Sequence, residues 1–174
     1  MITETVEIGA LAPDFTLETA GRQPWRLSDH RGKVVALLFY PKDETLVCTK
    51  QLCSVRDNWD DYLKTKAVIV GISPGTVDEH EQFARNHHLP LSLLADSDGE
   101  VTRLYTQTRW LPIWFTRAIV VIDAKGIIRT RKVMLRARRP TDYSVIADIY
   151  GAQTDLHLAR YDEILVQHRK KSAP

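Results

Sequence analysis

The chain has 174 residues and a mass of 19.9 kDa, a length typical of one domain that folds without disulfides or a structural metal. Its 44% hydrophobic and 26% charged residues are ordinary for a globular protein, and a net charge of +2 gives no reason to expect a nucleic-acid partner. The two cysteines are too few for a four-cysteine zinc site or a disulfide-rich scaffold. We therefore predict a single domain over residues 1–174, in which residues 170–174 form a frayed tail.

No export or membrane segment is evident in the sequence. The N-terminus carries Glu4 and Glu7 and lacks the basic and apolar regions of a secretory signal. The longest apolar runs, at 34–40, 67–72 and 118–122, are far shorter than the ~18 residues of a membrane helix. We therefore expect a cytoplasmic protein, in which a cysteine pair is more often catalytic or metal-binding than a structural disulfide.

Alternating or continuous apolar runs predict strands, whereas apolar residues that recur every three or four positions predict helices. In chain order these patterns give a strand at 12–17, a turn-rich segment at 21–32, a strand at 33–40, a helix at 47–64, a strand at 67–72, a helix at 77–87, a strand at 91–95, a short helix at 101–106, a strand at 116–123, a hairpin strand at 127–135, and helices at 142–150 and 155–169. This order predicts an α/β sandwich around a mixed sheet, with ligand sites beyond the carboxyl ends of the strands.

Several positions have a specific expected role in these elements. The apolar run at 33–40 suits a strand that is buried on both faces. Thr76 and Glu79 have the spacing of a capping box at a helix start. Gly151 is expected to end the helix before it, and Thr154 to cap the helix that follows.

Cys48 lies in the first turn of the predicted helix, just past the strand at 33–40. Free N–H groups and the positive end of the helix dipole favour an anion there, so we expect a lowered pKa and a nucleophilic thiolate. Thr45 can direct its hydroxyl at the same point, and Pro41 ends the strand and excludes solvent from one side. The alternative, that both cysteines are small buried apolar side chains, stays open on this evidence.

Cys48 and Cys53 fall in the same predicted helix, five residues apart. Such a pair is separated by ~7.5 Å along the helix axis and by ~140° around it, so the two α-carbons lie roughly 8–9 Å apart. A disulfide requires less than ~7 Å between them. The first turns of the helix must therefore unwind before the bond can form, which indicates a transient, switched disulfide. The four intervening residues also disfavour a thioredoxin-type redox motif, which has two.

The residues around Cys48 resemble those of a known family. The run at 41–48, Pro-Lys-Asp-Glu-Thr-Leu-Val-Cys, is similar to the peroxiredoxin active-site motif. Its continuation to Cys53 resembles the Q subfamily, the bacterioferritin comigratory proteins, in which a resolving cysteine often lies five residues after the peroxidatic one. The resemblance covers roughly residues 6–135. It places Arg117 where the family has its second active-site arginine.

The resemblance implies a thiol peroxidase with two reactive cysteines. Cys48 would attack the peroxide and become a sulfenic acid. Arg117 would lower the pKa of the thiolate and stabilise charge in the transition state, and Thr45 would hold the peroxide oxygens in line. Cys53 would then form an intramolecular disulfide, which thioredoxin or a similar dithiol reduces. No metal or organic cofactor is implied.

The resemblance also implies a thioredoxin-like α/β/α sandwich with a central mixed sheet and an N-terminal β extension. Tyr40 and Pro41 are the expected residues of the substrate pocket. Leu46 and Val47 replace the usual Pro-Gly pair, and Gln51 stands where glutamate is frequent. We expect a hydroperoxide substrate, no membrane or nucleic-acid partner, and a monomer or a homodimer.

Other functions stay open from the sequence. A redox sensor or interaction protein could use the same disulfide as a switch without rapid turnover. The apolar segment at 110–115 either packs under the sheet edge, lines the peroxide pocket or contacts another subunit. We interpret the six basic residues within 129–139 as a solvated hairpin face, in preference to a nucleic-acid or membrane surface. The histidines lack metal-ligand spacing and are interpreted as surface residues, and Arg56 and Asp57 as a surface pair.

Overall fold

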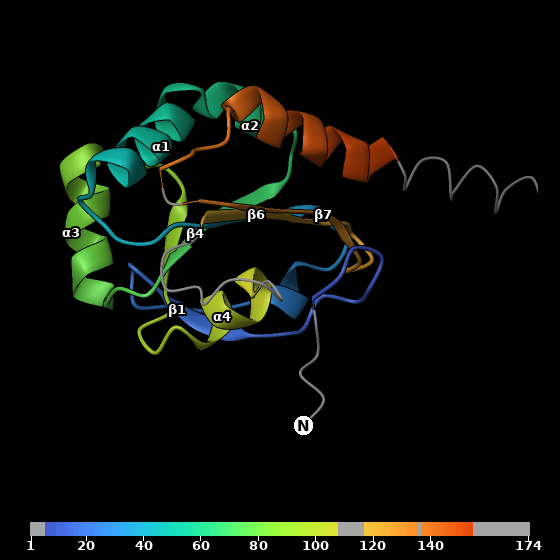
Figure 1. Ribbon diagram of the computed structural model, residues 1–174, viewed down its shortest axis with the longest axis horizontal. Helices are drawn as coiled ribbons and strands as arrows, with labels where there is room; N and C mark the ends of the chain where they lie inside the picture. The colour runs from blue at the N-terminus through green and yellow to red at the C-terminus, as the bar shows by residue number, and fades with distance from the viewer. Residues whose placement is uncertain (1–5, 108–116, 136, 155–174) are drawn as a thin grey trace, which may run out of the picture.

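The computed structural model describes residues 6–107, 117–135 and 137–154, and Figure 1 shows their arrangement. Its elements in chain order are β1 (Thr16–Thr19), β2 (Pro24–Arg26), the 3-10 helix η1 (Leu27–His30), β3 (Val35–Phe39), α1 (Leu46–Asp57), α2 (Trp59–Lys64), β4 (Val68–Ser73), α3 (Val77–His87), β5 (Ser92–Ala95), α4 (Glu100–Thr106), β6 (Arg117–Ile122) and β7 (Ile128–Met134). A further helix runs from 142 to 154, where the described part of the chain ends.

The strands form one mixed sheet in the order β2-β1-β5-β4-β3-β6-β7. The three central strands β3, β4 and β5 are parallel, and the pairs on either side of them are antiparallel. The β1–β2 hairpin extends one edge of the sheet through β5, and β7 forms the other edge. The predicted mixed sheet with an N-terminal β extension is therefore confirmed.

The central strand β3 is buried on both faces, as its composition predicts. Its odd-numbered residues join α4 and the N-terminal segments in one core, which includes Val35, Leu37, Phe39, Val101 and Tyr105. Its even-numbered residues join α1, α2, α3 and the helix at 142–154 in a second core, which includes Ala36, Leu38, Leu52, Phe83 and Ile149. Figure 1 shows α1, α2 and the helix at 142–154 on one side of the sheet and α4 on the other.

The pairing of β3 with β6 brings distant parts of the chain to one place. The two strands are antiparallel, and Phe39 at the end of β3 is opposite Ala118 near the start of β6. Arg117, the first residue of β6, therefore lies beside the point where β3 gives way to the segment that leads into α1. The pairing register of β3 and β6 therefore brings Arg117 to Cys48, although the two residues are 69 positions apart in the chain.

The helix predicted at 47–64 is two helices, α1 and α2, which meet at Asn58. Asn58 has φ −106° and ψ 20°, outside the helical range. The carbonyl of Ser54 accepts both from the N–H of Asn58 at 3.1 Å and from its side-chain Nδ2 at 2.9 Å, and the same Nδ2 donates to Asp142 at 3.2 Å. The helix is therefore interrupted at a short polar residue that bonds both locally and to the helix at 142–154, although its apolar period continues.

The predicted end of a helix at Gly151 is wrong, because the helix continues through Gly151 to 154. Ile149 and Ala152 on either side of this glycine are buried against the sheet, and their burial outweighs the ~1 kcal/mol that glycine costs inside a helix. Thr154 is not an N-cap: it lies within the helix, and its hydroxyl donates to the carbonyl of Tyr150 at 2.9 Å. The second helix predicted at 155–169 and the tail at 170–174 lie outside the described residues.

The N-terminal strand is displaced from the predicted 12–17 to 16–19. Pro13 lacks an N–H group for the sheet, and the N–H of Ala12 donates instead to Gly126 at 2.9 Å. Other expectations are confirmed. Trp25 and Leu27 are buried in the turn-rich segment, and Thr76 and Glu79 exchange both hydrogen bonds of a capping box.

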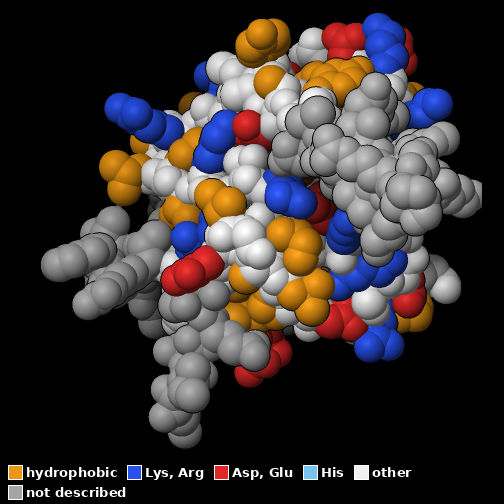
Figure 2. All heavy atoms as spheres, turned by 90° about the vertical axis from the view of Figure 1, so that its right-hand side faces the viewer, with side chains coloured by type: hydrophobic (Ala, Val, Ile, Leu, Met, Phe, Trp, Pro, Cys, Tyr) orange, Lys and Arg blue, Asp and Glu red, His pale blue; other side chains and the backbone are white. Residues whose placement is uncertain are grey.

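Three of the basic residues near β7 interact with other parts of the chain. Arg129 pairs with Asp123 at 2.6 Å, Lys132 with Asp148 at 2.5 Å, and Arg131 donates to the carbonyl of Tyr105 at 3.0 Å. On the face shown in Figure 2, basic side chains are interspersed with acidic and apolar ones. These contacts agree with the solvated hairpin face. The apolar segment at 110–115 lies outside the described residues.

The continuous helix across Gly151 predicts the effect of adding a methyl group there. Gly151 lies outside the left-handed region, and a Cβ at this position would meet no other described atom within 4 Å. We expect Gly151→Ala to raise the free energy of unfolding by ~0.5–1 kcal/mol in urea denaturation. The control is Gly126→Ala, where φ is +87° and the Cβ would overlap the Arg31 guanidinium, so the free energy should fall. A loss of stability in Gly151→Ala would show that the helix ends at this glycine.

Candidate active site

Cys48 is the third residue of α1 and has no exposed surface. The first backbone hydrogen bond of this helix runs from the N–H of Thr49 to the carbonyl of Thr45 at 2.8 Å. Cys48 therefore lies among the first N–H groups of the helix, where the dipole favours a negative charge. Its position confirms the prediction that this cysteine occupies a first helical turn.

Arg117 is fully buried and contacts the sulfur of Cys48 directly. Its Nη2 donates to Cys48 Sγ at 3.1 Å, and its Nη1 donates to Oε1 of Gln51, one turn along α1. A guanidinium is always charged, so the sulfur of Cys48 lies within hydrogen-bond distance of a fixed positive charge. The structure thus brings together two residues that the sequence placed in the site separately, at the start of α1 and the start of β6.

Thr45 is the N-cap residue of α1, with φ −78° and ψ 143°. Its hydroxyl donates to the carbonyl of Lys42 at 3.2 Å, which leaves the oxygen lone pairs available as acceptors. Thr45 and Arg117 line one hollow of about 330 Å³, together with Leu46, Val47 and Ala137. Leu46 is strongly exposed at 71%, so the mouth of this hollow is apolar while Arg117 forms its charged wall.

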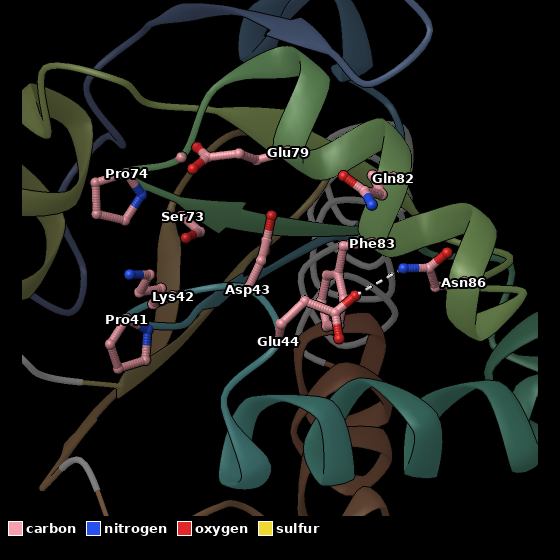
Figure 3. Close-up of a pocket in the computed structure, with 11 residues that line it drawn as sticks. Pro41, Lys42, Asp43, Glu44, Ser73, Pro74, Glu79, Gln82, Phe83 and Asn86 are labelled. Atoms are coloured by element: carbon pink, nitrogen blue, oxygen red, sulfur yellow. Dashed lines mark hydrogen bonds between the residues drawn. The ribbon is translucent and has the colours of Figure 1, made fainter.

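Tyr40 and Pro41, the other expected pocket residues, are not among the residues that line this hollow. Tyr40 is fully buried, and its hydroxyl donates to Asp43 at 2.7 Å. Burial, the negative charge of Asp43 and the nearby Cys48 raise the pKa of Tyr40, so its hydroxyl stays protonated. Pro41 lines a separate hollow of about 620 Å³ between the segment after β3 and α3, which Figure 3 shows in close-up.

Cys53 lies in α1 one and a half turns after Cys48, is half-buried, and both thiols are free. The helix is continuous from Leu46 to Asp57, so the five-residue separation has the helical geometry that prevents a disulfide. Arg56 forms the predicted surface pair with Asp57, at 2.8 Å. Arg56 also donates to the carbonyl of His87 at 2.7 Å, which ties α1 to the end of α3.

Sequence reasoning missed two parts of the site. Gln51 is 97% buried and accepts a hydrogen bond from Arg117. The sequence alone shows only a glutamine at a position where glutamate is frequent. The prediction that the histidines lie on the surface is wrong for His80, which has no exposed surface and faces Asp43. The i, i+7 spacing of His80 and His87 on α3 could have indicated one shared face, but their partners come from a different segment.

Residues 6–107, 117–135 and 137–154 contain no group of three or more His, Cys, Asp or Glu side chains placed to hold a metal ion. Among the same residues, no helix has the length and apolar character needed to cross a membrane.

Comparisons with known proteins agree with this geometry. A model of the AhpC/TSA family matches residues 8–131. A relative from Coxiella burnetii is 43% identical over 101 residues, which are 58% of this chain and 67% of that protein. Peroxiredoxin Bcp of Bacillus subtilis is 39% identical over 101 residues, which are 58% of this chain and 64% of that protein. The chain thus spans about two thirds of the length of these relatives.

Solved structures give the same result for the fold. Peroxidoxin BcpB from Mycobacterium tuberculosis superposes with a TM-score of 0.72 at 27% identity, over 84% of this chain and 97% of that one. A reduced 2-Cys peroxiredoxin of Plasmodium vivax superposes with a TM-score of 0.75 over 86% of this chain and 98% of that one, and its 23% identity supports the fold alone. The family model and the fold agree, and the chain belongs to the AhpC/TSA family.

Proposed function

We propose that this protein is a thiol peroxidase that reduces hydroperoxides with the Cys48 thiolate. The observation that carries the proposal is the hydrogen bond of 3.1 Å from Arg117 Nη2 to Cys48 Sγ in the first turn of α1. A buried guanidinium and a helix N-terminus both favour the thiolate, and the thiolate is the nucleophilic form of cysteine. Membership of the AhpC/TSA family supports the same assignment.

In the first step the thiolate sulfur of Cys48 attacks one oxygen of the hydroperoxide. The O–O bond breaks, the sulfur becomes a sulfenic acid, and the other oxygen leaves as water or an alcohol after it takes up a proton. Arg117 stabilises the negative charge that develops on the oxygens, because its position is fixed by Gln51 before the substrate binds. The Thr45 hydroxyl accepts a hydrogen bond from the peroxide and keeps it in line with the sulfur.

The hollow beside Arg117 supports both hydrogen peroxide and organic hydroperoxides as substrates. Its volume of about 330 Å³ is much larger than hydrogen peroxide requires. Leu46, Val47 and Ala137 supply apolar walls that suit the carbon chain of an organic hydroperoxide.

Cys53 completes the cycle by resolving the oxidised Cys48. Its thiolate attacks the sulfenic sulfur and forms the disulfide, and the hydroxide that leaves takes up a proton and becomes water. Because the intact helix keeps the cysteines too far apart, the start of α1 must unwind first. A dithiol protein of the thioredoxin type then reduces the disulfide by exchange and is itself oxidised to a disulfide. A reducing compartment such as the cytoplasm maintains that reductant.

The two cysteines are expected to give different defects when each is replaced. Cys48→Ser should abolish peroxide consumption, because the attacking sulfur is gone. Cys53→Ser should consume about one equivalent of peroxide per chain and then stop, because the sulfenic acid has no resolving thiol. Both results are measured as peroxide loss with thioredoxin, its reductase and NADPH. Turnover in Cys48→Ser would refute the proposal, and a wild type limited to one equivalent would favour the redox-sensor alternative.

Replacement of Arg117 should slow the first step without removing the thiol. We expect Arg117→Lys to lower the rate constant for Cys48 oxidation by ~10²-fold, since lysine cannot reach both Cys48 and Gln51 with the same fork of donors. Stopped-flow measurement in the Cys53→Ser background isolates this step. Arg26→Lys, an exposed arginine paired with Asp14, is the matched control and should keep the wild-type rate. Equal rates in both variants would exclude Arg117 from the chemistry.

The hydroxyl of Thr45 is expected to matter more than its volume. Thr45→Val keeps the shape but removes the oxygen, and the loss of one hydrogen bond worth ~1.4 kcal/mol should slow Cys48 oxidation about tenfold. Thr45→Ser should restore most of the rate. If valine and serine variants oxidise equally fast, the threonine acts only as a spacer.

A further inference from the structure

The segment between β3 and α1 is fastened to α3 by a buried carboxylate–imidazole contact. Asp43 Oδ2 lies 2.5 Å from Nδ1 of His80, and the His80 side chain has no exposed surface. Gly75 packs against the same ring, since a Cβ there would lie 2.7 Å from its Cε1 atom. The contact belongs to no step of the peroxidase chemistry described above, yet it is only two residues from Thr45.

The partners of His80 determine its charge. Nε2 lies 3.3 Å from the carbonyl of Ser73 and 3.2 Å from the carbonyl of Leu94, and both oxygens can only accept, so Nε2 carries a proton. Asp43 accepts from the Tyr40 hydroxyl on Oδ1 and faces Nδ1 with Oδ2. A carboxylate beside a ring whose two nitrogens both face acceptors has the geometry of an ion pair of aspartate and imidazolium.

Other charged groups near the pair are consistent with this assignment. Glu79 on α3 and Lys42 in the segment before α1 are the charged residues that line the adjacent hollow near the ring, with Glu44 further along it. Hydrogen bonds from Thr76, and less strongly the positive charges of His80 and Lys42, lower the pKa of Glu79. The hollow in Figure 3 gives solvent access to the edge of Asp43, whose side chain is 10% exposed, while the imidazole stays buried.

Tyr40 connects the ion pair to the cysteine. It is buried in the same core as Cys48, and the charges of both Asp43 and Cys48 act on its hydroxyl. Its hydroxyl donates to Asp43 at 2.7 Å, so the end of β3 and the segment after it are held by one carboxylate. A movement of Asp43 would therefore displace Tyr40 in the core that it shares with Cys48.

Glu44, the next residue, makes a second contact with α3. It adopts a left-handed φ of 54°, which is costly for a residue with a side chain and persists only where surrounding contacts hold it. Its carboxylate accepts from Asn86 at 3.1 Å, seen in Figure 3, and lies 2.9 Å from Nε2 of His87. His87 lowers the pKa of Glu44. Two adjacent carboxylates thus bind two histidines that are seven residues apart on α3.

We propose that Asp43 and His80 are positioning residues of the peroxidase site: as an imidazolium–carboxylate pair they fasten the segment before α1 to α3 and hold Thr45 and the first turn of α1 where Cys48 reacts. The inference rests on the proposed function. Neither residue touches the substrate, so their effect on the reaction passes through Thr45 and Cys48.

The kinetic test uses three variants in the full chain with Cys53→Ser, in which only Cys48 oxidation is observed. Asp43→Asn keeps an acceptor for Tyr40 but removes the charge, and His80→Gln removes the imidazolium. We expect each to lower the rate constant of oxidation about tenfold, and the double variant to be no slower than either. Tyr62→Phe, which removes a 2.7 Å hydrogen bond to Asp142, is the control that loses stability but keeps the rate.

A spectroscopic test separates an ion pair from ordinary packing and needs no peroxide. The ¹⁵N shifts of His80 in the reduced wild-type chain at pH 7 should show both ring nitrogens protonated, and Asp43→Asn should convert the ring to its neutral form. A neutral ring in the wild type overturns the proposal, as do wild-type rates in folded variants or additive losses in the double variant. If a variant does not fold, the ¹⁵N shifts of His80 in the wild-type chain alone decide between an ion pair and a neutral ring. A Cys53→Ser parent that fails to react with peroxide would instead refute the peroxidase function.

Discussion

The hydrogen bond from Arg117 to Cys48 joins strand β6 of the sheet to helix α1. The geometry of the candidate site depends on this contact. Burial of a guanidinium without hydrogen-bond acceptors lowers the stability of the fold by several kcal/mol. Arg117 has no exposed surface, and Gln51 and Cys48 are among the acceptors that surround it. The buried charge of Arg117 is therefore balanced in part by its hydrogen bonds to the side chains of these two residues of α1. The order of strands, with β6 beside β3, makes this contact possible.

The helix α1 places Cys48 in its first turn and also keeps Cys53 away from it, so the proposed cycle needs α1 intact in one step and open in the next. Contacts with neighbouring elements hold α1 on both sides of its cysteine-containing turns. Its later part is tied to the helix at 142–154 through Asp142, which accepts from Ser54 and from Tyr62 of α2. The start of α1 is held from the other side, by the segment that Asp43 fastens to α3. In the proposed cycle, these contacts would confine the unwinding to the turns that contain the two cysteines.

Features that depend on local composition or on a motif could be predicted from the sequence. The strand at 33–40 follows from its continuous apolar run, and the placement of Cys48 and Arg117 from the resemblance of the surrounding residues. The errors arose where a distant or competing partner decides. The helix predicted at 47–64 is interrupted at Asn58, which donates to Asp142, 84 residues later in the chain, and His80 is buried because a carboxylate 37 residues earlier in the chain pairs with it. Tertiary packing determines such pairings, and the periodic pattern of apolar residues in one segment does not predict them.

In the proposed cycle Cys48 reacts as a thiolate in a folded helix and is resolved by Cys53 after that helix opens. Mass spectrometry of the reduced chain, treated with one equivalent of hydrogen peroxide and digested without reductant, tests this cycle. We expect one cross-linked species that joins the peptides of Cys48 and Cys53 within a single chain, with hydrogen exchange increased at the start of α1. Unmodified Cys48, or a disulfide found only between two chains, would contradict it.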